Sequence, residues 1–297
     1  MVGAGGGSFF TLRAGALALT LAPAVGGSIA RFEYLRDGEA FPILRGCEGD
    51  IDDVLAMGSF PLVPYVNRIR GGQFRFRDRL VSMAPNMAGD PSPLHGQGWL
   101  GSWQVMEAGD SDALLRFDHE FGEWPWAYSA EQRFKLGDDR LELSLACTNQ
   151  SDEAMPCGLG QHPYFHCGPS TRIETRVSDV WLIDEHVLPT EKVAAEGPYD
   201  LSDTRVCGMG LDHGFGGWSG NARLSDPDWP FALVMRSPDA HFFQLYSPFS
   251  GGIFVAEPVT HANAALNAPE EAWAELGMKI LEPGDSMSLT MVLEVIS

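Results

Sequence analysis

Two titratable side chains stand in settings that suit proton transfer. His162 lies within residues 161–165, whose sequence is QHPYF, and histidine has a pKa near working pH, as a general acid requires. Glu257 follows the apolar residues 253–256, and desolvation there would raise the pKa of its carboxyl and make it a stronger base. The two residues form a candidate acid–base pair, although Glu257 taken alone could be an ordinary glutamate at the end of a strand.

Asn67 and Arg68 stand just before the turn signal Gly71-Gly72. A guanidinium presents several N–H donors in a fixed fork, so the two side chains could bind the hydroxyls of a sugar. The alternative is a solvated hairpin whose arginines, which recur as far as Arg79, all point outward.

Two glycine-rich segments carry further candidate binding groups. His95 lies in the sequence SPLHGQGW, where glycines allow backbone and ligand to approach closely, and Trp99 and Trp103 could offer a flat apolar surface to a sugar ring. Asp212 lies in the sequence LDHGFGGW, and a carboxylate can accept two hydroxyl hydrogen bonds. A turn with a surface histidine and a turn initiated by aspartate are the respective alternatives.

Histidines and cysteines near position 162 also raise the question of a metal site. His162 and His166 are four residues apart and lie between Cys157 and Cys167. Pro163 disfavours the helix that would bring the two histidines together. On a strand, residues four apart lie about 13 Å from one another, too far for one ion. We therefore expect no metal here.

The charge of the chain limits the class of partner. Forty acidic residues against 20 basic ones give the 297 residues a formal net charge of −20. Such an envelope repels phosphate backbones and anionic lipid surfaces, so nucleic acid and membranes are poor partners and a neutral small molecule is a better one. No apolar stretch approaches the length of a membrane span. Five cysteines without a CxxC motif are typical of reduced thiols in a cytoplasmic protein.

Short alternating segments predict an all-β fold. Leucines alternate with polar residues over 141–145, and apolar residues do so again over 287–295. Residues 13–25 could be a signal peptide, but the alternation of leucines over 17–21 and the next alternating run at 29–34 favour strands. The best helix candidate covers residues 269–276, with Asn267 as a possible cap. We expect one antiparallel sandwich domain over residues 1–297.

Five motifs, in order, resemble those of the aldose 1-epimerase (galactose mutarotase-like) family. They are Asn67-Arg68, LHG at 94–96, HPYF at 162–165, LDHGF at 211–215 and EPVTH at 257–261. Residues 279–289 are similar to the closing strand pair of the family. The resemblance covers nearly the whole chain and implies a twisted β-supersandwich, in agreement with the strand pattern.

The resemblance also implies roles for individual residues. His162 matches the family's general acid and Glu257 its general base, while Arg68, His95 and Asp212, with Asn67 beside them, match its substrate-binding residues. The implied reaction interconverts the α and β anomers of a free aldose by opening and reclosing the sugar ring, and proton transfer alone suffices without a cofactor. Residues 123–128 resemble an aromatic segment that could wall the pocket.

Several alternatives stay open at this point. The residues around the acid and over 246–251 differ from those of many galactose-type members, so the aldose is undetermined. A sugar-binding or regulatory protein without turnover would keep the same pocket, and a glycosidase could use Glu257 and Asp212 as paired carboxylates. Either a monomer or a homodimer is compatible with the sequence.

Overall fold

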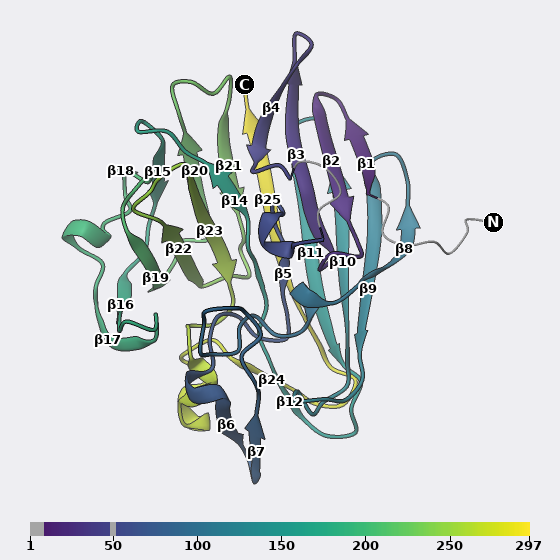
Figure 1. Ribbon diagram of the computed structural model, residues 1–297, viewed down its shortest axis with the longest axis vertical. Helices are drawn as coiled ribbons and strands as arrows, with labels where there is room; N and C mark the ends of the chain where they lie inside the picture. The colour runs from purple at the N-terminus through teal and green to yellow at the C-terminus, as the bar shows by residue number, and fades with distance from the viewer. Residues whose placement is uncertain (1–8, 48–51) are drawn as a thin grey trace.

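Two large antiparallel sheets dominate the computed structural model of the chain, which describes residues 9–47 and 52–297 (Figure 1). In spatial order, the nine-stranded sheet comprises β18 (Thr204–Arg205), β15 (Arg172–Thr175), β20 (Asn221–Ser225), β21 (Ala232–Arg236), β25 (Ser286–Ile296), β11 (Arg140–Asn149), β10 (Tyr128–Leu136), β9 (Asp112–His119) and β8 (Gln104–Ala108). The eight-stranded sheet comprises β17 (Pro189–Ala194), β16 (Asp179–Ile183), β19 (Leu211–Gly216), β22 (Phe242–Ser247), β23 (Ile253–Val259), β13 (Gly160–Gln161) and β5 (Pro61–Leu62), with β14 (Tyr164–His166) paired to β23.

Smaller sheets and short turns complete the fold. The four-stranded sheet is formed by β1 (Phe10–Ala14), β2 (Leu17–Ala22), β3 (Ser28–Arg36) and β4 (Glu39–Leu44). The two-stranded sheets pair β6 (Gln73–Phe76) with β7 (Arg79–Ser82) and β12 (Met155–Cys157) with β24 (Lys279–Leu281). The described 3₁₀ turns are η1 (Val54–Ala56), η2 (Arg70–Gly72), η3 (Gly98–Leu100), η4 (Gly197–Tyr199), η5 (Ala265–Asn267) and η6 (Glu270–Ala272). Throughout the described ranges, no helix has the length and apolar character needed to cross a bilayer.

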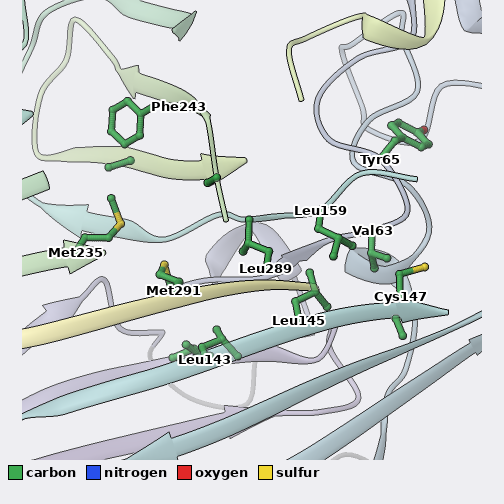
Figure 2. Packing of buried hydrophobic residues seen from close by; sticks show 14 of the residues in the cluster. Val63, Tyr65, Leu143, Leu145, Cys147, Leu159, Met235, Phe243, Leu289 and Met291 are labelled. Atoms are coloured by element: carbon green, nitrogen blue, oxygen red, sulfur yellow. The ribbon is translucent and has the colours of Figure 1, made fainter. Parts of the chain in front are cut away.

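The core lies between the two large sheets, and strand alternation explains why. On β11, Leu143 and Leu145 are buried, and they pair in register with Met291 and Leu289 of β25. These side chains meet the inward face of the other sheet, represented by Phe243 on β22 (Figure 2). Successive residues of a strand point to opposite faces, so the predicted all-β sandwich and its alternating strands are confirmed.

The same alternation places Glu257 on the outer face of the eight-stranded sheet. Phe254 and Ala256 of β23 belong to the main core, whereas Val255 belongs to a second buried cluster on the opposite face. Glu257, two residues beyond Val255, therefore shares the outer face with it. The inward-facing residues of β23 pack in the core and so fix the position of the strand that carries Glu257.

The strand interpretation of residues 13–22 is confirmed, because β1 and β2 pair antiparallel over this region. The predicted helix at 269–276 is wrong. Only the short 3₁₀ turn η6 forms within this range, η5 lies just before it, and Asn267 caps neither of them. Its side chain instead donates to the carbonyls of Arg70 (3.1 Å) and Gln73 (2.9 Å), while Trp273 stacks on Phe76 at 5.4 Å between ring centroids. Tertiary contacts with the β6–β7 hairpin replace the helical pattern.

Candidate active site

A cavity of about 420 Å³ opens on the outer face of the eight-stranded sheet. This volume is typical of sites that bind small molecules. All six predicted site residues line it, namely Asn67, Arg68, His95, His162, Asp212 and Glu257. They come from five separate segments of the chain, so the structure brings together what the sequence motifs left apart.

His162 and Glu257 face each other across this cavity. The His162 Nε2 atom lies 3.6 Å from Glu257 Oε1. Glu257 is held within β23, opposite Gln244 of β22, and His162 occupies the short connection between β13 and β14, where its backbone N–H donates to the Phe60 carbonyl (3.0 Å). The strand-end alternative for Glu257 is therefore wrong, since the residue lies inside a paired strand.

Aromatic rings enclose the imidazole of His162. Phe60 stacks on it at 4.4 Å between ring centroids, and Tyr164 lies 4.7 Å from it. Within the described residues, His162 Nδ1 has no hydrogen-bond partner. Burial lowers the pKa of His162 to about 3, and the charge of Arg45 acts in the same direction. The ring is therefore neutral at neutral pH.

Burial shifts the pKa of Glu257 in the opposite direction from that of His162. Desolvation raises the pKa of its carboxyl well above the ordinary value, the charge of Asp212 raises it further, and Arg68 opposes both. Burial thus disfavours the charged form of both members of the pair. Burial therefore opposes the doubly charged arrangement, a protonated imidazole beside a carboxylate.

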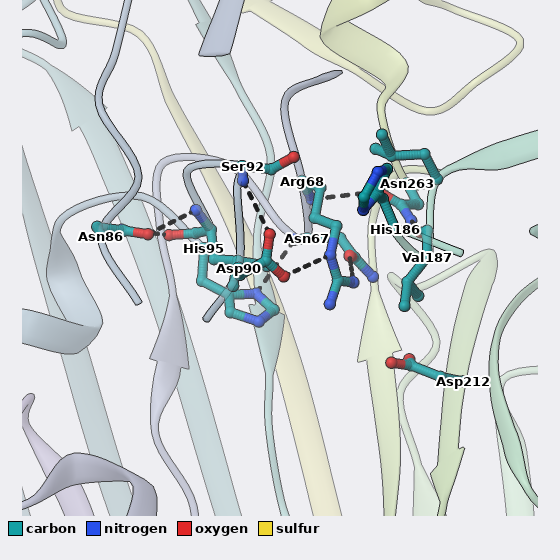
Figure 3. Close-up of polar contacts among 12 residues, drawn as sticks. Asn67, Arg68, Asn86, Asp90, Ser92, His95, His186, Val187, Asp212 and Asn263 are labelled. Carbon is teal, nitrogen blue, oxygen red and sulfur yellow. Dashed lines mark hydrogen bonds and ion pairs between the residues drawn. The ribbon is translucent and has the colours of Figure 1, made fainter. Parts of the chain in front are cut away.

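Asn67 and His95 hold each other on one wall of the cavity (Figure 3). The Asn67 N–H donates to His95 Nδ1 (3.1 Å), and the His95 N–H donates to the Asn67 carbonyl (3.0 Å). His95 is only 8% exposed, so the alternative of a surface histidine in a turn is wrong. Its ring stands edge-on to that of His162 at 5.5 Å.

Arg68 is held rigidly by its neighbours. Its Nε donates to Asp90 Oδ2 (2.9 Å) and its Nη1 donates to Asn67 Oδ1 (3.0 Å), while its backbone N–H donates to Asn263 Oδ1 (3.1 Å) (Figure 3). The side chains of Arg68 and Asp90 are 10% and 8% exposed, so this ion pair is buried. The solvated-hairpin alternative fails for Arg68, although it fits Arg70, whose side chain is 46% exposed.

Asp212 enters the cavity from β19. It lies on a strand opposite Tyr246 of β22, so the aspartate-initiated turn is ruled out. The Gln244 side-chain amide donates to Asp212 Oδ1 (2.9 Å). Burial raises the pKa of Asp212, and the charge of Arg68 opposes this shift.

Sequence reasoning missed several residues of the site. Gln244 and Asp90 contact predicted binding residues, Phe60 and Tyr164 pack on the imidazole, and Arg45 lines the cavity. Period-two counting back from Tyr246 would place Gln244 on the outer face. No local signal marks Asp90 or Phe60, because only the folded chain brings them to the site.

Aromatic expectations for the pocket need correction. Trp103 lies in the core against Phe117 (5.6 Å between centroids), and Trp124 and Trp126 pack on Phe74 there. None of these three tryptophans lines the cavity, so residues 123–128 do not wall it. Trp99 does border it, although only 1% of its surface is exposed. Its indole N–H donates to the Leu94 carbonyl (3.1 Å).

The histidine–cysteine cluster around position 162 is dispersed by the fold. His162 faces the cavity, whereas His166 is exposed and Cys157 is fully buried. In the part of the chain that the structure describes, no three His, Cys, Asp or Glu side chains gather in a way that could hold a metal ion.

Comparison with known proteins places the chain in a family. A sequence model of the family described as aldose 1-epimerase matches residues 8–294. The chain belongs to the aldose 1-epimerase family. The uncharacterised Escherichia coli K12 protein YphB is 34% identical over 247 residues, which are 80% of this chain and 83% of YphB.

Solved structures agree with this assignment. The crystal structure of a candidate aldose 1-epimerase from Escherichia coli K12 superimposes with a TM-score of 0.89 at 32% identity, covering 98% of this chain and 99% of the other. A galactose mutarotase-like protein from Clostridium acetobutylicum gives a TM-score of 0.83 at 21% identity, over 96% and 94% of the two chains, and so shows the fold alone. The fold is therefore that of the galactose mutarotase-like proteins.

Proposed function

We propose that this aldose 1-epimerase family member interconverts the α and β anomers of a free aldose, with Glu257 as base and His162 as acid. The observation that carries the proposal is the 3.6 Å approach of His162 Nε2 to Glu257 Oε1 inside a cavity whose walls combine apolar side chains with the polar groups of Asn67, Arg68, His95 and Asp212. An acid and a base at one carbon–oxygen centre are what opening of a hemiacetal requires.

The proposed reaction moves one proton around the pair. A sugar hydroxyl that donates to Glu257 stabilises the carboxylate, so binding shifts the single proton to His162. Glu257 then removes the proton from the C1 hydroxyl while His162 protonates the ring oxygen, and the C1–O5 bond breaks to give the aldehyde. After rotation about C1–C2, the two residues exchange roles and reclose the ring. Each turnover restores the initial protonation states without a cofactor.

The remaining polar residues bind and orient the sugar in this proposal. Arg68, fixed by Asp90, presents donors, and Asp212, oriented by Gln244, presents acceptors. Rigid groups lose little conformational entropy when the ligand binds. Asn67 and His95 complete the set of side chains that contact hydroxyls.

Anomer exchange measured by NMR over a panel of hexoses and pentoses tests the proposal. We expect faster exchange for at least one aldose and no release of reducing sugar from aryl glycosides. Cleavage of aryl glycosides would instead indicate a glycosidase that uses Glu257 and Asp212. Sugar binding by calorimetry without any acceleration would indicate a silent binding protein.

A further inference from the structure

One cation of the cavity, Arg45, is not accounted for by the proposed reaction. It follows β4 and is tied to Tyr164, because its backbone N–H donates to the Tyr164 carbonyl (2.8 Å) and its guanidinium carbon lies 3.7 Å from the centre of the Tyr164 ring. Its Nη2 donates to the carbonyls of Leu55 and Met57, the latter at 2.7 Å. These contacts fix the guanidinium in the cavity wall.

The charge of Arg45 lacks the compensation that Arg68 has. Arg68 forms a buried ion pair with Asp90, whereas no carboxylate within residues 9–47 and 52–297 lies at ion-pair distance from Arg45. Carbonyl oxygens satisfy hydrogen bonds but do not neutralise a charge. Burial lowers the pKa of Arg45 and outweighs Tyr164 and the more distant charge of Asp53, both of which raise it. The net lowering is a sign that the charged form is incompletely compensated. An anion would gain more at such a cation than a neutral hydroxyl would.

Strand register places Arg45 relative to the reacting atoms. Tyr164, Val255, Tyr246 and Asp212 lie side by side on adjacent strands and form one row across the outer face. Glu257 stands two residues further along β23, a displacement of about 7 Å. Arg45 stacks on Tyr164 at one end of this row, and Asp212 lies at the other end. Glu257 therefore stands about one residue pair along the strands from the row that Arg45 adjoins. A sugar whose C1 lies at Glu257 can direct a distant carbon toward Arg45.

We infer that Arg45 selects aldoses that carry an anionic group, a carboxylate or a phosphate, on the carbon farthest from C1. This inference rests on the proposed function for the position of C1 and adds the substrate class. The net charge of −20 does not exclude it, since the field of surface charges is screened over about 10 Å at ordinary ionic strength. A contact inside the cavity is screened much less.

Rates of anomer exchange with D-glucuronate, D-glucose 6-phosphate and D-glucose test this inference. We expect the wild-type kcat/KM for at least one of the two anionic sugars to exceed that for glucose at least tenfold, and the two anionic arms distinguish a carboxylate from a phosphate. Arg45→Met keeps an apolar stem on Tyr164 and should lower the anionic-to-neutral ratio about tenfold to hundredfold, the range expected for a lost charge-assisted hydrogen bond. Arg45→Lys should retain part of the ratio.

Arg31 provides the matched control. Its Nε donates to the Cys47 carbonyl (2.7 Å), so it also ties a loop through a carbonyl, but it does not line the cavity. Arg31→Met should leave the anionic-to-neutral ratio unchanged. An equal loss of rate for all three sugars in Arg45→Met would assign Arg45 a structural role and overturn the inference, as would a wild-type preference for glucose.

Calorimetric binding separates this inference from the proposed function. If the wild-type protein accelerates no sugar, the proposed function fails, but the dissociation constants for glucuronate, glucose 6-phosphate and glucose still test Arg45. Tighter binding of an anionic sugar that is lost in Arg45→Met supports the inference. Equal binding of the anionic and neutral sugars contradicts it.

Discussion

Asn67 and His95 exchange two backbone-anchored hydrogen bonds, of 3.1 and 3.0 Å, across 28 positions of sequence. Both residues have left-handed backbone conformations, with φ of 58° and 59°. Because His95 Nδ1 accepts one of these bonds and burial keeps the pKa of the ring well below its ordinary value, the neutral ring must carry its proton on Nε2. His95 can therefore donate a hydrogen bond to a sugar oxygen.

Gly96, which follows His95, should not tolerate a side chain. Its φ is 74°, and a Cβ there would lie 2.1 Å from the Val63 carbonyl oxygen. Gly96→Ala should lower the melting temperature and weaken sugar binding by displacing His95. Gly89→Ala is the control, because Gly89 has a φ of 87° but no atom within 4 Å of an added Cβ. Equal losses in both variants would show that backbone strain, and not the steric clash, decides the outcome.

The proposed catalytic pair predicts a specific kinetic loss. His162→Asn and Glu257→Gln should each lower kcat about 10²–10⁴-fold, the usual contribution of a general acid or base. The double variant should lose little more than the worse single variant, because the two residues act on one proton. Thermal melting and sugar binding by calorimetry serve as controls for folding. Retained turnover in either single variant would remove that residue from the mechanism.

The pH dependence of kcat/KM should follow the state in which the pair holds one proton. A second proton can be added only as pH falls toward the depressed pKa of His162, about 3. The acid limb of the profile should therefore lie well below pH 6.5, the ordinary value for histidine. At high pH, loss of the proton from the pair, in which the pKa of Glu257 is raised, should end activity. An acid limb near pH 6.5 would contradict this assignment.

Folding stability should also depend on pH through His261. Its Nε2 accepts from the Val66 N–H (2.9 Å) and its Nδ1 donates to the Ala262 carbonyl (2.8 Å), and burial lowers its pKa to about 4. The unfolded chain takes up this proton near pH 6.5 and the native state does not, so stability is present above pH 6.5 and is lost as pH falls to about 4. This group alone accounts for about 3 kcal/mol.

Denaturant titrations between pH 4 and 7 measure that loss. His261→Gln should be less stable at pH 7 and should show a shallower dependence on pH, whereas replacement of the exposed His186 should leave the wild-type slope. An unchanged slope in His261→Gln would assign the dependence to other groups.

The buried ion pair of Arg68 predicts a contrast with an exposed pair. Asp90→Asn leaves the guanidinium buried without its counter-charge and should destabilise the fold by about 3 kcal/mol, as well as raise KM by loosening Arg68. Glu282→Gln breaks the pair with Arg77, whose side chains are 52% and 62% exposed, and should change stability too little to measure. Urea unfolding measures the free energy of unfolding of both variants. Similar losses of stability in the two would contradict a structural role for the Arg68–Asp90 pair.

Local patterns in the sequence predicted the class of fold and singled out His162 and Glu257 as the candidate acid–base pair. Alternation over residues 141–145 specifies β11 and its buried face, because side-chain direction in a strand is a property of successive residues. The motifs around His162 and Glu257 pointed to the family, which the comparisons then showed. Both the alternation and the motifs are read from residues that are close together in the sequence.

Tertiary structure alone decided which groups meet. Asp90 fixes Arg68 and Phe60 stacks on His162, and neither partner follows from local periodicity. Periodicity could place Gln244 on the outer face, but only the pairing of β19 with β22 brings it to Asp212. Trp103 entered the core and Asn267 bonded the β6 strand where helix signals suggested a cap. Register between strands far apart in sequence, and the burial that comes with it, sets such contacts and the pKa shifts that depend on them.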